Sequence, residues 1–112
     1  MFGNINDQME NLVEKNQWEK ITKKLDGADA KTRLAAAAAC AKTKDGRGLN
    51  ILISLLKDND AAVQLQAIKS IGMVGNVNAK THLQWISEHL PEGREGVKEA
   101  IQEAIMQIGK WK

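Results

Sequence analysis

The chain has 112 residues, of which 43% are apolar and 4% aromatic, and its formal net charge is +2. This length is enough for one hydrophobic core without disulfide or metal staples, and the single cysteine, Cys40, has no partner for an internal disulfide. No segment approaches the ~18 consecutive apolar residues of a membrane span, and the first ten residues lack the basic flank and apolar run of a secretory signal. We therefore expect a cytoplasmic protein without a membrane partner.

Basic residues are concentrated between residues 17 and 45, a segment that contains seven basic and four acidic side chains. Binding to duplex DNA through its phosphates generally requires a denser row of cations on one face. Nucleic acid is therefore not the expected partner, although weak backbone binding through this basic region stays open as an alternative.

Hydrophobic periodicity predicts seven helices and no strand. The chain has one proline, one phenylalanine and no tyrosine, and it shows no sustained alternation of apolar and polar residues. The expected helices span about 7–15, 17–25, 30–42, 49–57, 61–74, 79–90 and 97–110.

Polar residues at the helix starts supply the expected caps. Capping boxes are predicted from Asp7 with Glu10 and from Asn16 with Glu19, and Asn16 could instead end the first helix in a left-handed conformation. Further N-caps are expected at Asp29, Asp60 and Asn78.

The helix expected at 49–57 is apolar nearly all round, which requires neighbours on several sides. The helix expected at 97–110 is instead clearly divided into an apolar and a polar face, as an end helix should be. The first helix is amphipathic and can cover the open side of the next helices. We expect a complete, self-capped array.

A short apolar phrase recurs along the chain. Ala67-Ile-Lys-Ser-Ile-Gly72 and Ala104-Ile-Met-Gln-Ile-Gly109 nearly repeat each other, and Ala36 to Ala41 occupies the place of a third copy. From Ala36 to Ala67 is 31 residues and from Ala67 to Ala104 is 37, a period typical of stacked helical repeats. The prediction is a single all-α domain over 1–112, an α-α superhelix of about three helix pairs that we expect to be a monomer. Its expected parts are a cap helix (1–16), repeat 1 (17–45), repeat 2 (46–75) and repeat 3 with a polar C-terminal cap (76–112).

The segment from Leu55 to Gly72 resembles the short HEAT-like repeats of the phycobilisome-lyase type. Asp58, Val63, Ala67 and Gly72 match the repeat pattern, and the resemblance extends from about residue 17 to 109. It implies an armadillo-like α solenoid and, by analogy, an accessory chain or chaperone of a bilin lyase or another modification enzyme. The arginine expected after Val63 is Gln64 here, whereas Arg33 holds the equivalent place in repeat 1, so the family's ionic ladder is not expected in the middle repeat.

Residues suited to catalysis or metal binding are sparse. His82 and His89 are seven residues apart on one helix, about 10 Å along its axis, which is too far for one metal ion. Cys40 lies in an alanine run and is expected to be a buried, inert thiol. We expect no catalytic, cofactor or metal site, and therefore no enzyme.

The expected functional surface is the concave side, which the second helix of each pair lines in such arrays. The first hypothesis is a non-enzymatic module or scaffold that binds a protein or peptide there. Trp85 could be core or a partner anchor, and Trp111 could be folded back or exposed. The candidate contact residues are Arg33, Ala37, Lys44, Gln66, Lys69, Ser70, Met73, Gln102, Glu103 and Met106.

Overall fold

The computed structural model describes residues 3–109, and within them the chain forms seven α-helices, one 3₁₀ turn and no strand. The all-α prediction is confirmed. The elements are α1 (Ile5–Glu14), α2 (Trp18–Leu25), α3 (Ala30–Ala39), η1 (Cys40–Lys42), α4 (Gly46–Leu55), α5 (Ala61–Val74), α6 (Val77–Glu88) and α7 (Glu95–Gly109).

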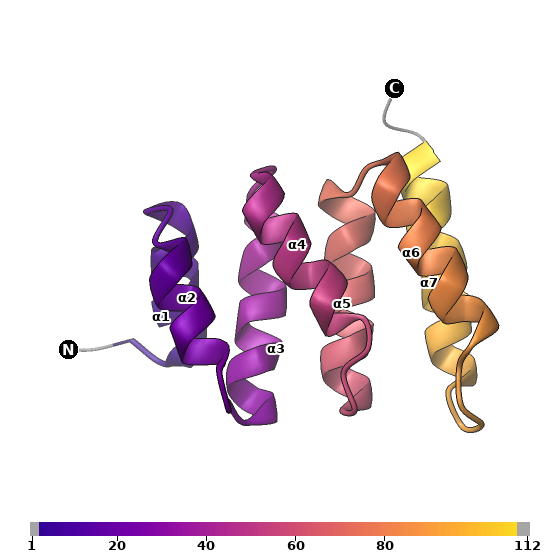
Figure 1. The fold of residues 1–112 in the computed structure, drawn as a ribbon, viewed down its shortest axis with the longest axis horizontal. Coiled ribbons are helices and arrows are strands. Elements are labelled where there is room, and N and C mark those ends of the chain that lie inside the picture. Colours follow the sequence, from indigo (N-terminus) through magenta and orange to yellow (C-terminus); the bar gives the residue numbers. More distant parts are fainter. Residues whose placement is uncertain (1–2, 110–112) are drawn as a thin grey trace.

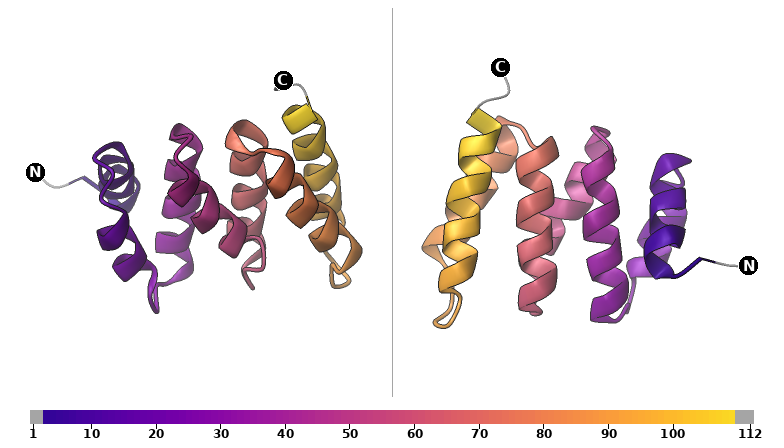
Figure 2. Two further views of the ribbon diagram at one scale, coloured as in Figure 1. Left: turned by 45° about the horizontal axis from the view of Figure 1, so that its top comes forward. Right: turned by 180° about the vertical axis from the view of Figure 1, so that it is seen from behind.

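The helices stack in two layers (Figure 1). We call α2, α4 and α6 the first layer, and α1, α3, α5 and α7 the second layer, which faces the viewer in the right panel of Figure 2. Within the second layer α1 packs on α3, α3 on α5, and α5 on α7, while α4 packs on α5 and α6 on α7 across the layers. The chain is thus an α-α solenoid, and α1 extends the second layer beyond α3.

Two predicted N-caps and the left-handed helix end at Asn16 are confirmed. The Asp29 carboxylate accepts a hydrogen bond from the Thr32 backbone N–H at 2.9 Å, and Asp60 accepts from two N–H groups in the first turn of α5. Asn16 has a φ of 56°, so it ends α1 in the left-handed conformation that asparagine tolerates well.

Four helices, α1, α4, α6 and α7, begin two or three residues earlier than predicted. In α1, α4 and α6 a polar side chain upstream of the predicted start caps the helix. The Asn4 side chain, rather than an Asp7 box, caps α1, and α2 follows Gln17 without a side-chain cap. Asn76 caps α6 in place of Asn78. At the starts of α1 and α6 the sequence offers more than one Asn or Asp residue, and periodicity alone does not choose among them.

Small residues set the spacing within the second layer. Ala35, Ala36, Ala37 and Ala39 of α3 are buried, and Gly72 of α5 lies against the backbone of α7. Such residues allow helix axes to approach closely, since no long side chain separates them. Bulkier side chains fill the space between the layers, among them Met9, Ile21, Leu52, Leu56, Ile68, Ile71, Leu83 and Ile101.

An ion pair joins the first two helix pairs. The Arg33 guanidinium donates to both carboxylate oxygens of Asp58, at 2.7 and 3.0 Å, and also to the Ala28 carbonyl. Asp58 accepts a further bond from the Asp60 backbone N–H. Burial by itself raises the pKa of Asp58, but the hydrogen bonds and the Arg33 charge outweigh it, so the pKa lies below its ordinary value.

A second polar contact joins the second and third helix pairs, and it uses a combination of residue types other than the arginine–aspartate pair of the first contact. The Gln64 side chain is buried although it is polar. Its amide nitrogen donates to the Leu56 carbonyl at 2.8 Å, and its oxygen accepts from Arg94, which also donates to the Asn59 carbonyl. Arg94, in the turn before α7, therefore supplies the cation that the sequence lacks at position 64.

Replacing Gly72 by alanine should destabilise the fold. A Cβ there would lie 3.1 Å from the Ala104 Cα, which is backbone of a packed helix and has little room to move. We expect a loss of about 1–3 kcal/mol, offset only in part by the ~0.5–1 kcal/mol that alanine gains over glycine in a helix. Urea denaturation measures the difference. Gly96→Ala, where a Cβ meets nothing within 4 Å, is the matched control and should show no loss; equal behaviour of the two variants would contradict this packing account.

The stabilisation from Asp58 should depend on pH. Because its pKa is lower in the folded state, the contribution is present above the ordinary value of 3.8 and is lost as the pH falls through the folded value. Asp58→Asn should lower the free energy of unfolding by about 1–2 kcal/mol at neutral pH, and the gap to the parent protein should narrow below the ordinary value. Denaturation curves at several pH values test this. The exposed Asp26→Asn variant is the control, and a gap independent of pH would argue against the ion pair.

Candidate functional site

Four of the ten residues predicted to bind a partner serve the fold instead. Ala37 and Ser70 are completely buried, and the Ser70 hydroxyl donates to the Ala37 carbonyl at 2.7 Å between α3 and α5. Their expected exposure is corrected, because the close packing of these helices leaves them no outer surface. Arg33 is half-buried and held by Asp58. Gln66, also half-buried, donates to the Ser70 hydroxyl.

The other predicted residues are exposed on or beside the second layer. Met73 and Met106 have relative exposures of 54% and 66%. Lys69 lies on α5 with Met73, and Lys44 lies in the turn before α4. Gln102 and Glu103 accompany Met106 on α7. This face is therefore a mixed polar surface with two methionines.

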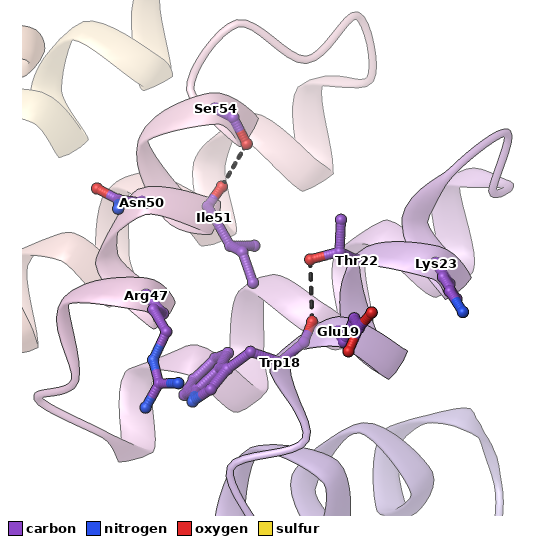
Figure 3. Close-up of a pocket in the computed structure, with 8 residues that line it drawn as sticks. All are labelled: Trp18, Glu19, Thr22, Lys23, Arg47, Asn50, Ile51 and Ser54. Atoms are coloured by element: carbon purple, nitrogen blue, oxygen red, sulfur yellow. Dashed lines mark hydrogen bonds between the residues drawn. The ribbon is translucent and has the colours of Figure 1, made fainter.

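The first layer carries two grooves, which the sequence did not indicate. The α2–α4 groove has a volume of about 620 Å³. Figure 3 shows Trp18 and Thr22 of α2 facing Arg47 and Ile51 of α4 across it. The α4–α6 groove has a volume of about 600 Å³, and Ser54 lines both grooves. The other residues that line the α4–α6 groove are Ile53, Leu56, Lys57, Thr81, His82, Trp85 and Ile86.

The apolar composition of α4 accounts for both grooves. Leu52 and Leu55 point into the core and are buried, whereas Ile51 and Ile53 are only half-buried. Ile51 lines the α2–α4 groove and Ile53 the α4–α6 groove. The expectation that a helix apolar all round is covered on several sides thus holds in part. Its uncovered apolar side chains are the signal that could have located the grooves.

Trp85 is the large aromatic side chain exposed in the α4–α6 groove, with a relative exposure of 49%. The Lys57 ammonium lies 5.0 Å from its ring centroid, a cation–π distance. The His89 ring stacks on it at 3.9 Å with an interplanar angle of 11°, and His89 Nδ1 lies 2.8 Å from the Trp85 carbonyl oxygen. These contacts restrict the orientation of the indole.

Trp18 lies at the α2–α4 groove and is buried. The Arg47 guanidinium lies 5.6 Å from its ring centroid and is also paired with Asp45 at 2.8 Å. The Trp18 indole N–H is buried and has no hydrogen-bond acceptor among the described residues. An unpaired buried donor of this kind costs about 1–3 kcal/mol.

The residues considered for catalysis are dispersed. His82 and His89 are exposed, and within residues 3–109 no three His, Cys, Asp or Glu side chains are grouped so that they could hold a metal ion. Cys40 is completely buried, and burial raises the pKa of its thiol to about 11. A thiol of that pKa is protonated at neutral pH and is a poor nucleophile. Trp111 lies outside the described residues.

The family model for HEAT repeats matches residues 19–106, so this chain belongs to the HEAT-repeat family. HEAT repeats generally mediate protein–protein interaction. No curated protein and no solved structure matches the chain. Among the described helices, none combines the length and apolar character needed to cross a membrane. The phycobilisome-lyase subtype stays a prediction.

Cys40 should not react while the protein is folded. Because its thiol is buried and protonated, labelling by a thiol-specific reagent at neutral pH should require unfolding. The measurement compares the rate of labelling in buffer with that in denaturing urea. Rapid labelling of the folded protein would show that the alanine-rich part of α3 opens readily, contrary to the close packing described above.

Proposed function

We propose that this chain is a non-enzymatic interaction module that binds a protein or peptide through its first layer. The observation that carries the proposal is Trp85, a half-exposed aromatic side chain that contacts Lys57 and His89 in a groove with an apolar floor. Tryptophan is enriched at the energetically dominant positions of protein interfaces. A fixed side chain also loses little conformational entropy when a partner covers it.

The first layer is favoured over the second-layer surface expected from the sequence. On the second layer, Ala37 and Ser70 are buried and Arg33 is engaged with Asp58, which removes the centre of the expected contact area. The exposed Met73 and Met106 could still contact a partner, since methionine adapts to varied surfaces. The first layer, however, provides recessed surfaces that a side chain of the partner could enter.

A catalytic role has little support among the described residues, because the Cys40 thiol is buried and His82 and His89 are exposed on the side of the first layer. The accessory role in a lyase or another modification system remains a more specific version of the same proposal. It requires a partner enzyme, so the same binding experiment bears on it.

Trp85→Ala should abolish or strongly weaken the capture of the partner. The tagged protein is used to capture proteins from the lysate of its native host with and without nuclease treatment, and the captured proteins are quantified by mass spectrometry. We expect a near-stoichiometric protein that is lost with Trp85→Ala, since truncating an interface tryptophan typically costs at least ~2 kcal/mol.

Met106→Ala is the matched control, because it truncates an exposed apolar side chain on the opposite layer. Circular dichroism should show that both variants remain folded. Loss of the partner with Met106→Ala but not with Trp85→Ala would return the binding surface to the second layer. Captures that disappear on nuclease treatment would instead favour nucleic acid.

A further inference from the structure

We propose that the first layer binds an acidic peptide segment with apolar side chains, which lies across α4 and enters both grooves. This inference rests on the proposed function and adds the chemistry of the partner. It is carried by the arrangement of charge, apolar surface and aromatic rings around α4.

The charges around the grooves favour a partner that bears carboxylates. Lys57 is the one charged residue among the residues that line the α4–α6 groove, all of which lie in the described part of the chain. The α2–α4 groove is lined by one carboxylate, Glu19, and by two cations, of which Arg47 is already paired with Asp45 and Lys23 is not. Asp58, beside Lys57, is already bound by Arg33. Complementary charge favours the encounter with an acidic segment and disfavours a basic one.

The apolar side chains lie where one extended chain could reach them. Ile51 faces one groove and Ile53 the other, and Ser54 lines both, so the grooves adjoin at this point of α4. The Ser54 hydroxyl donates to the Ile51 carbonyl at 2.8 Å, which leaves its oxygen able to accept a hydrogen bond from a peptide N–H. Apolar side chains of the peptide would cover Ile51 and Ile53, while its carboxylates approach Lys57.

The aromatic rings favour a peptide over single-stranded nucleic acid. Proteins bind single strands largely by stacking bases on open aromatic faces. Lys57 and His89 already contact the Trp85 ring, His89 by stacking, and Trp18 is buried. A base would have to displace these neighbours, whereas an apolar side chain can pack against the exposed part of the Trp85 indole.

The test measures binding of fluorescein-labelled peptides by fluorescence anisotropy. The probe is composed of glutamate, leucine and glycine, and two matched peptides replace either every glutamate by lysine or every leucine by serine. We expect the glutamate–leucine peptide alone to bind, and its affinity to fall with added salt. Lys57→Met, which keeps the alkyl stem near Trp85, should weaken binding about two- to fivefold, as expected for an exposed ion pair.

Lys69→Met is the control, since it removes the same charge from the exposed surface of the second layer and should leave the affinity unchanged. Absence of binding, equal binding of the lysine peptide, equal losses in the two variants, or displacement by a single-stranded oligonucleotide would each overturn the inference. If the captured partner still depends on Trp85 in that case, the proposed function stands and only the acidic chemistry of the partner is wrong.

Discussion

The close approach of helices within the second layer is the constraint on which the rest of the structure depends. Ser70 bonds directly to the backbone of α3, and Gly72 lies against the backbone of α7, so α5 is held tightly between its neighbours. In the first layer, by contrast, α4 and α6 contact each other sparsely. A stack joined closely in one layer and loosely in the other leaves recesses on the loose side, which is where both grooves occur.

Polar contacts at the turns fix the order of the helix pairs without occupying those recesses. Arg33 reaches Asp58 in the next pair, and Arg94 reaches back to Gln64 and Asn59. The two contacts have different chemistry and come from different places in their repeats. What they share is a guanidinium group that binds the turn before α5, where several backbone groups would otherwise need water. This turn is therefore held from both sides, and α5 with it.

The sequence was sufficient for the architecture because repeated spacing and helical periodicity are properties of the chain itself. It was insufficient for the surface. Ser70 is polar and was therefore expected on the surface, yet its hydroxyl donates to a backbone carbonyl in the interior, which offsets the cost of its burial. Ile51 and Ile53 are apolar and were expected to be covered, yet the spacing of α2, α4 and α6 leaves them half-open. Both errors arise from contacts between residues that are far apart in the sequence. Hydrophobic periodicity describes each helix by itself and carries no information about such contacts.

The central helix α4 links the packing of the array to its proposed recognition surface. Arg47 near its start approaches Trp18, and Lys57 just after its end approaches Trp85, so each groove has a tryptophan and a cation on opposite walls. The pairs differ in one respect that matters for binding: Arg47 is paired with Asp45, whereas among the described residues Lys57 has no carboxylate partner. The surface free to meet a carboxylate is therefore the α4–α6 groove, and the α2–α4 groove serves mainly to receive the apolar part of the same segment.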